Sequence, residues 1–143
     1  MAARHGRENE IGFGMRLQVV CRETEKEAWD FAHGLVEHAS EAQKAIVKER
    51  FATSEANRRV RELAAIGETI EPHLWTGITQ VRPGAGIAIV GDPEQCADTL
   101  QKFIDLGCHS FCLSGYLHDE EAERFGKWIM PILRQRNPGR MSA

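Results

Sequence analysis

Three consecutive residues, Ser114, Gly115 and Tyr116, follow a short apolar run and have side chains that could do chemistry. The hydroxyl of Ser114 and the phenol of Tyr116 can donate and accept hydrogen bonds. A glycine between them lets the backbone turn sharply or approach a ligand closely. The plainer interpretation is an ordinary turn with a half-buried tyrosine, because most turn glycines serve backbone geometry alone.

Arg16 and Gln18 are a second pair of candidates, because they share one face of a segment whose other face is apolar. If their face points into a barrel, a guanidinium and an amide are buried together. Burying an unpaired charge is costly, so such residues tend to be ion-paired or functional. Two plainer interpretations stay open: an internal salt bridge, or an edge strand whose polar face is exposed to solvent.

Local signals set the boundaries of the elements that must position these residues. Alternating residues predict a first strand. Thr24 and Glu27 have the spacing of a capping box, and Asp92 followed by Pro93 is typical of another helix start. Within one domain, 1–143, we therefore expect the following elements: a strand at about 12–21, helical segments at about 24–66, a long loop at about 68–90, a helix at about 92–106, a strand at about 109–113 and a helix at about 119–134.

Strands that alternate with helices predict an α/β fold with a parallel sheet and helical crossovers. In such folds, chemistry gathers at the carboxyl ends of the strands. Ser114, Gly115 and Tyr116 stand at such an end. The segment 68–91 holds two prolines and four glycines without a steady period, which is typical of a functional loop or a mobile segment.

Composition excludes several classes of partner. The net charge is −3 over 143 residues, with no basic segment that predicts nucleic-acid binding. No apolar run is long enough for a membrane span, and the first ten residues lack the apolar core of a secretory signal. We therefore expect a cytoplasmic protein with reduced cysteines. Cys108 and Cys112 flank His109, but zinc sites need closer paired ligands, so we expect buried thiols and no metal.

Three segments carry a family resemblance: "FGMRLQVVCRETEKEAW", "LWTGITQVRPGAGIAIVGDPE" and "FCLSGYLHDEEAERFG". From about Arg4 to Leu133, the chain resembles the closing part of the bacterial luciferase-like flavin monooxygenases, and within them the alkanesulfonate monooxygenases. The resemblance implies a TIM barrel that takes reduced FMN from a separate NAD(P)H-dependent FMN reductase. It also implies a small organosulfur substrate and O2, with carbon–sulfur cleavage to an aldehyde and sulfite.

The resemblance assigns roles to residues of the first strand and the loop. The family's seventh barrel strand has an arginine, a leucine and a histidine, matched here by Arg16, Leu17 and, in place of the histidine, Gln18. Arg16 is thereby implied to be catalytic and Gln18 to bind substrate. Gln18 cannot shuttle a proton near neutral pH. Arg82 matches an arginine in the family's closing loop, and this arginine is thereby implied to be catalytic and to bind substrate. Its planar guanidinium can donate two parallel hydrogen bonds to a sulfonate.

The resemblance also covers the segment that contains Ser114, Gly115 and Tyr116. The family's eighth strand ends in Ser-Gly-Tyr followed by Pro-His, and Ser114, Gly115, Tyr116 and His118 match this motif, with Leu117 in place of the proline. Tyr116 is thereby implied to be catalytic, and the Ser-Gly-Tyr motif to contact the cofactor. For His118 we prefer the plainer interpretation of a histidine that orders the helix start.

A TIM barrel needs eight strands and typically about 250 residues. We therefore expect the carboxyl-terminal part of a TIM (β/α)8 barrel, with its last two strands, their helices and the long active-site loop. We expect weak or absent FMN binding, no activity alone, and unpaired barrel edges that favour self-association. The alternatives are a sister enzyme that oxidises sulfones, a non-catalytic remnant that dimerises through the apolar face of "EAWDFAHGLV", and an unrelated α/β protein, against which three ordered motifs argue.

Overall fold

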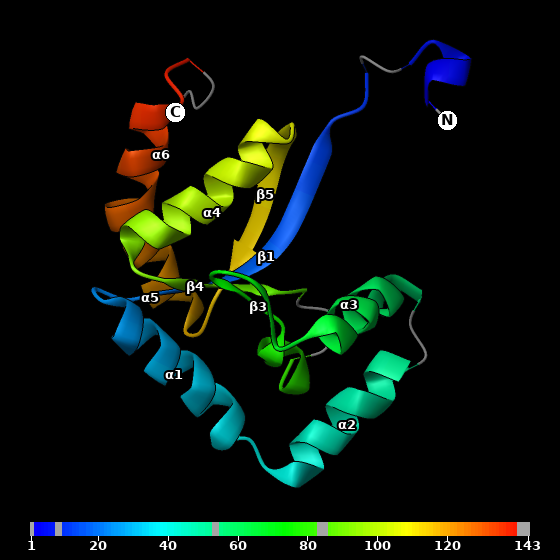
Figure 1. The fold of residues 1–143 in the computed structure, drawn as a ribbon, viewed down its shortest axis with the longest axis vertical. Helices are drawn as coiled ribbons and strands as arrows, with labels where there is room; N and C mark the ends of the chain where they lie inside the picture. The colour runs from blue at the N-terminus through cyan, green and yellow to red at the C-terminus, as the bar shows by residue number, and fades with distance from the viewer. Residues whose placement is uncertain (1, 8–9, 53–54, 83–85, 140–143) are drawn as a thin grey trace.

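The computed structural model describes residues 2–7, 10–52, 55–82 and 86–139 (Figure 1). The elements follow in this order: a 3-10 helix (Ala2–His5), β1 (Phe13–Cys21), α1 (Glu25–Glu37), α2 (Glu41–Ala52), α3 (Glu55–Ile66), β2 (Thr69–Glu71), β3 (Leu74–Trp75), a 3-10 helix η2 (Gly77–Gln80), β4 (Ala88–Gly91), α4 (Pro93–Asp105), β5 (Cys108–Ser114), α5 (His118–Arg124), a π-helical turn (Phe125–Ile129) and α6 (Met130–Arg136). Residues 53–54 of the expected helical segments and residues 83–85 of the expected loop lie outside the described residues.

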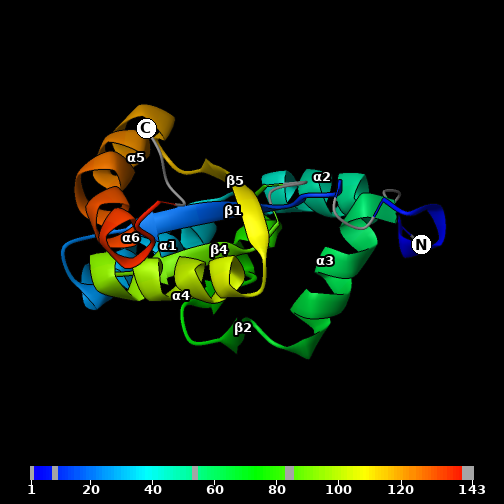
Figure 2. The ribbon, with the colours of Figure 1, turned by 90° about the horizontal axis from the view of Figure 1, so that it is seen from above.

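A single five-stranded sheet organises the fold, in the order β2-β3-β4-β1-β5. β1 lies parallel to both β4 and β5, whereas β3 pairs antiparallel with β2 and β4. The two strands expected from the sequence therefore pair directly with each other in parallel. The fold is α/β, as predicted, and helices lie on both faces of the sheet (Figure 2).

Each face of the sheet has its own apolar core. β1 shows why: Leu17, Val19 and Cys21 point to one face, and Val20 points to the other. The first core packs β1 and β4 against α4 and α6. The second packs them against α1 and Trp75, which is 0% exposed.

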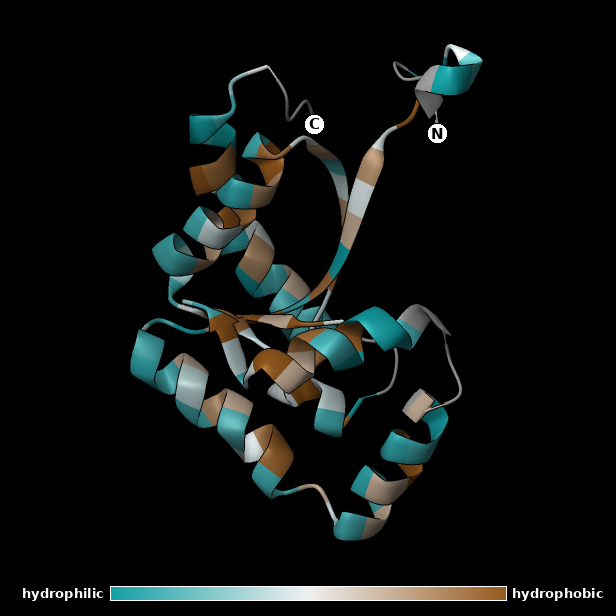
Figure 3. Cartoon of the chain, turned by 45° about the vertical axis from the view of Figure 1, so that its right-hand side comes forward, coloured by the Kyte–Doolittle hydropathy of each residue, from teal (hydrophilic) through white to brown (hydrophobic). Residues whose placement is uncertain are grey.

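The apolar face of α1 belongs to the second core. Ala28 and Ala32 are fully buried there, and Trp29, Phe31, Leu35 and Val36 pack against the same core. Figure 3 shows apolar residues concentrated in the central strands and on the inner sides of the helices that cover them. The apolar residues of "EAWDFAHGLV" therefore contribute to this chain's own core.

Side-chain caps start the two helices that follow β1 and β4. The Thr24 side chain accepts a hydrogen bond from the backbone N–H of Glu27, and Asp92 does the same for Gln95. In both helices, the side chain of the third helical residue accepts a hydrogen bond from the backbone N–H of the capping residue, so both are complete capping boxes. The helix start expected at Thr24 and the one expected at Asp92 are both confirmed.

The segment 68–90 differs from the expected long loop. It contains β2, β3, η2 and most of β4, which is a third parallel strand. All four residues of β4, Ala88–Gly91, are buried. A strand covered on both faces has no polar alternation, and the neighbouring glycines made this short apolar run look like loop.

The last helix is interrupted, as Pro131 requires. A π-helical turn, in which the Met130 N–H donates to the Phe125 carbonyl, separates α5 from α6. Pro131 then occupies the start of α6, where its missing N–H is tolerated. Within the described ranges, no helix is both long enough and apolar enough to cross a membrane.

Candidate active site

β5 ends beside β1 at Ser114, which lies opposite Gln18. The Gln18 side chain donates a hydrogen bond from Nε2 to Ser114 Oγ, with 2.7 Å between these atoms. Gln18 is 0% exposed, and its Oε1 atom has no partner among the described residues. A buried acceptor that lacks a donor is costly. The Oε1 atom is thus a buried acceptor whose hydrogen-bonding capacity is unused among the described residues.

Arg16 lies on the same face of β1 as Gln18, but its side chain is exposed. Its partner across the strand pair is Cys112, which is also exposed. The reason is the position of β4, which begins at Ala88 opposite Gln18 and therefore does not reach Arg16. Gln18 is therefore buried, as the barrel interpretation requires, whereas Arg16 is exposed, as the interpretation of a solvated strand face requires.

Gly115 is buried immediately after β5. A Cβ atom on this residue would lie 2.5 Å from Glu121 Cγ and 3.0 Å from the Val19 carbonyl oxygen. Glycine is therefore required here by close packing against the first turn of α5. This packing brings the strand end that carries Tyr116 against the helix that follows it.

Arg82, from the segment after η2, lies near Tyr116 and His118, from the turn after β5 and the start of α5. The Arg82 guanidinium carbon lies 5.5 Å from the centre of the Tyr116 ring, within the range of a cation–π contact. Arg82 Nη2 also lies 3.5 Å from His118 Nε2, where a weak hydrogen bond forms if that nitrogen is unprotonated. The three residues combine a fixed positive charge, a phenol and an imidazole at the carboxyl end of the sheet.

A cavity of about 630 Å³ opens beside Tyr116. Its walls come from α1 and α2, and Val81, the residue before Arg82, completes it. The lining is mostly apolar and includes Phe31, Leu35, Ile46 and Val47. An apolar group could therefore lie here with its polar end toward Tyr116.

The sequence reasoning missed a buried ion pair next to these residues. Arg22 Nη1 lies 2.5 Å from Glu121 Oε1, and the side chains are 14% and 5% exposed. Arg22 also stacks over the Phe31 ring, 3.8 Å from its centre. The signal was weak, because Glu121 stands in a run of three acidic residues that predicts only a solvated helix start.

The cysteines are split between core and surface. Cys21 and Cys96 are buried, Cys108 is half-buried and Cys112 is exposed. The expectation of buried thiols, which concerned Cys108 and Cys112, is therefore wrong for Cys112 and only partly met by Cys108. A hydrogen bond with Cys21, together with burial, raises the pKa of the Cys96 thiol far above its ordinary value. Cys96 is therefore an inert thiol.

Among the described residues, no cluster of three or more His, Cys, Asp or Glu side chains could hold a metal ion.

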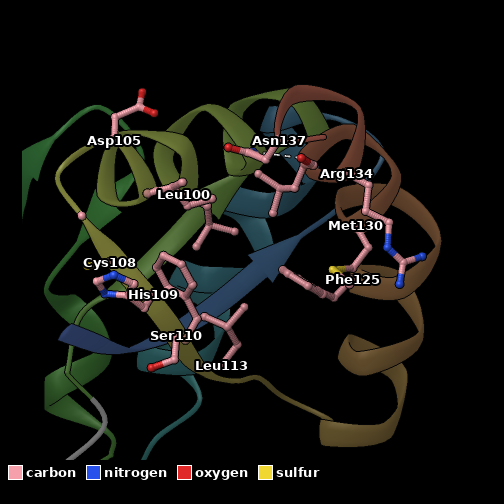
Figure 4. A pocket seen from close by; sticks show the side chains of 14 residues that line it. Leu100, Asp105, Cys108, His109, Ser110, Leu113, Phe125, Met130, Arg134 and Asn137 are labelled. Atoms are coloured by element: carbon pink, nitrogen blue, oxygen red, sulfur yellow. Dashed lines mark hydrogen bonds between the residues drawn. The ribbon is translucent and has the colours of Figure 1, made fainter. Parts of the chain in front are cut away.

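A second cavity, of about 560 Å³, lies along β5 between α4 and α6 (Figure 4). Its lining is apolar at Leu100, Phe111 and Leu133, with polar groups such as His109 and Arg134. None of Gln18, Arg82 and Tyr116 lines it. This cavity is therefore separate from the Arg82–Tyr116 contact.

Comparisons with known proteins identify a family and a similar fold. The sequence pattern of the luciferase-like monooxygenases matches residues 1–110. The structure is similar to that of DmoA from Hyphomicrobium sulfonivorans, with a TM-score of 0.67, 22% identity, and coverage of 94% of this chain and 32% of that one. It is also similar to the riboflavin lyase RcaE, solved with a modified FMN and riboflavin, with a TM-score of 0.62, 17% identity, and coverage of 94% and 34%. The chain thus spans about a third of the length of these structures.

Proposed function

This chain belongs to the luciferase-like monooxygenase family, and on that premise we propose that it forms part of an alkanesulfonate-type monooxygenase that uses reduced FMN. In the proposed reaction, an alkanesulfonate, reduced FMN and O2 give an aldehyde, sulfite, oxidised FMN and water. Reduced flavin supplies the two electrons that reduce one oxygen atom to water. The observation that carries the proposal is the contact of Arg82 with Tyr116 at the carboxyl end of the sheet.

Arg82 is proposed to bind the anionic group of the substrate. Its guanidinium has no carboxylate partner among the described residues, and its neighbours are the Tyr116 ring and His118. A guanidinium offers two parallel donors, which match two oxygens of a sulfonate. Tyr116 then lies beside the bound anion, where its hydroxyl can donate to or accept from the reacting group.

Arg16 and Gln18 are proposed to contact the substrate from β1. Arg16 is exposed on the same face as Gln18, so a ligand on this face would meet a positive charge, and the buried Gln18 Oε1 atom is an unpaired acceptor beneath it. The neutral amide of Gln18 supports a second candidate function. Because it adds no charge, a sister activity on sulfones or other neutral organosulfur compounds is the alternative.

The cofactor fits the described residues only in part. Ser114 and Tyr116 can offer hydroxyl groups to a flavin ring, and Gly115 is the residue between them. Among the described residues, the starts of α1 and α4 offer no comparable place for the phosphate, because both are closed by capping boxes that carry the acidic residues Glu27 and Asp92. Negative side chains there disfavour a phosphate. We therefore propose that this chain alone binds reduced FMN weakly, and that no turnover occurs without further barrel strands.

Sulfite release tests the proposal. The chain is assayed alone and after reconstitution with the amino-terminal barrel strands of a luciferase-like relative, with O2, NAD(P)H and an FMN reductase. We expect sulfite from the reconstituted barrel only, and its loss in Tyr116→Phe and Arg82→Gln variants. Undiminished sulfite release by both variants would show that neither Tyr116 nor Arg82 belongs to the active site. Saturable binding of reduced FMN to the chain alone at low micromolar concentration, measured anaerobically by fluorescence, would contradict the cofactor argument.

A further inference from the structure

The buried ion pair of Arg22 and Glu121 has no role in the chemistry proposed above. The Glu121 carboxylate is 5% exposed, and its Oε1 atom accepts from Arg22 at 2.5 Å and from Arg124 at 2.9 Å. Its Oε2 atom is buried without a partner among the described residues. Removing charges from water is costly, and a buried pair with one oxygen unsatisfied is a poor source of stability. A role in geometry explains this pair better than a role in stability.

The pair joins the ends of the strands that form the candidate site. Arg22 follows β1 directly and donates from Nη1 to the Cys21 carbonyl oxygen at 2.6 Å. Glu121 lies on the other side, in α5, and its methylene groups fill the space that a side chain on Gly115 would need. The ends of β1 and β5 are therefore held together through one carboxylate.

Both neighbours of Tyr116 in the chain contact Glu121. On one side is Gly115, packed against the Glu121 side chain. On the other is Leu117, whose carbonyl oxygen accepts from the Glu121 N–H at 2.9 Å. Any shift of Glu121 must therefore move the backbone that orients the Tyr116 ring toward Arg82.

The same pair also supports the cavity beside Tyr116. Arg22 stacks over Phe31, and Phe31 and Tyr116 both line the cavity of about 630 Å³. One guanidinium thus lies between the cavity wall on α1 and the carboxylate that holds the Tyr116 turn.

We propose that Arg22 and Glu121 are positioning residues that set the orientation of Tyr116 relative to Arg82 and to the cavity. The inference rests on the proposed function, because it takes Tyr116 as a residue of the active site. Neither residue is assigned contact with the substrate or the flavin. The carboxylate acts on the reaction only through the backbone on both sides of Tyr116.

The test uses the fact that Tyr116 is the single tyrosine of the chain. Labelling with 3-fluorotyrosine gives one 19F resonance, whose position reports the surroundings of the Tyr116 ring. We expect Arg82→Gln to shift this resonance in the otherwise unchanged chain. In a Glu121→Gln background, the resonance should already be displaced, and the shift caused by Arg82→Gln should be lost.

Glu120→Gln is the matched control, because Glu120 is 51% exposed on the same helix and also pairs with Arg124. This variant should retain both the resonance position and the response to Arg82→Gln. If Glu121→Gln behaves like Glu120→Gln, the positioning proposal is wrong. If Arg82→Gln leaves the resonance of the unchanged chain in place, the Arg82–Tyr116 contact that carries the proposed function is wrong instead.

A second variant keeps the test decisive if Glu121→Gln does not fold, as judged by circular dichroism and thermal unfolding. Arg22→Lys retains the charge but loses the planar group that stacks on Phe31 and reaches two acceptors. We expect it to fold, to displace the Tyr116 resonance and to weaken its response to Arg82→Gln. A folded Arg22→Lys chain with an unchanged resonance and an unchanged response would overturn the proposal.

Discussion

The Arg82 guanidinium carbon lies 5.5 Å from the centre of the Tyr116 ring, although one residue follows η2 and the other follows β5. The contact forms because both segments arrive at the carboxyl end of the sheet. It brings a permanent positive charge against the face of an aromatic ring, which is a favourable arrangement. Arg82 Nη2 also lies 3.5 Å from His118 Nε2, so the same guanidinium faces both a phenol ring and an imidazole.

Arg82→Lys and Arg16→Lys should each reduce turnover in the reconstituted barrel while leaving folding intact. Lysine keeps the charge but loses the planar fork. We expect a loss of roughly 10- to 100-fold in kcat/KM, because one hydrogen bond to a charged group contributes about 1.5–3 kcal/mol. Sulfite release measures the effect, and thermal unfolding checks the fold. Arg134→Lys, an exposed arginine on α6, is the control that should change neither. Unchanged kinetics in both test variants would make these arginines structural.

Gln18→His should move the substrate preference toward sulfonates. A histidine can carry a positive charge near neutral pH, whereas the amide of Gln18 stays neutral. The unchanged protein should therefore favour neutral or small sulfur substrates over long alkanesulfonates. We expect the variant to gain up to about 1–3 kcal/mol of binding for an anionic substrate. The measurement is product release from a panel of sulfones and sulfonates. A wild-type preference for long sulfonates, with no gain in the variant, would contradict this interpretation of Gln18.

Gly115→Ala should destabilise the chain by ~1–3 kcal/mol, the usual cost of overpacking a well-packed site. The new methyl group would lie 2.5 Å from Glu121 Cγ and 3.0 Å from the Val19 carbonyl oxygen. Urea unfolding measures the loss. Gly126→Ala is the matched control, because no atom lies within 4 Å of its added Cβ. The control should be neutral or more stable by about 0.5–1 kcal/mol, since alanine favours helix over glycine. Equal effects at both positions would mean that Gly115 is not tightly packed.

Thiol labelling should separate the cysteines by location and by pH. An aromatic disulfide reagent should modify the exposed Cys112 quickly and the buried Cys21 and Cys96 only on unfolding. The pKa of Cys96 is raised by its hydrogen bond with Cys21 and by burial, so alkaline buffer should not accelerate its labelling in the folded chain. In the unfolded chain, this thiol loses its proton near its ordinary pKa. The free energy of unfolding should therefore fall as the pH rises above that value. Fast labelling of Cys96 in the folded chain would contradict this prediction.

Much of the fold could be predicted because its signals are local. The alternation of β1 and the caps at Thr24 and Asp92 involve residues within a few positions of one another. The strand β4 could not be predicted in the same way, because its four buried residues show no alternation. Only its position between β3 and β1 explains why it is a strand.

The candidate site was predictable in its residue types but not in their environment. The family resemblance singled out Arg82 and Tyr116, and the structure brings these two together. The exposure of Arg16 depends on where β4 begins, which the sequence around Arg16 does not contain. The burial of Glu121 depends on the absence of a side chain at Gly115, which lies in another element.

The central position of β1 has a consequence during synthesis. β1 lies between β4 and β5 in the sheet, and Gln18 bonds to Ser114, 96 residues later in the chain. At roughly 5–20 residues per second, about 5–20 s separate the synthesis of these two residues. Until β4 is made, β1 lacks both of its neighbours in the sheet, and until β5 is made it lacks one of them. The yield of folded protein should therefore depend on chaperones that hold unfolded segments, and on growth temperature, more than that of a helical protein of this length.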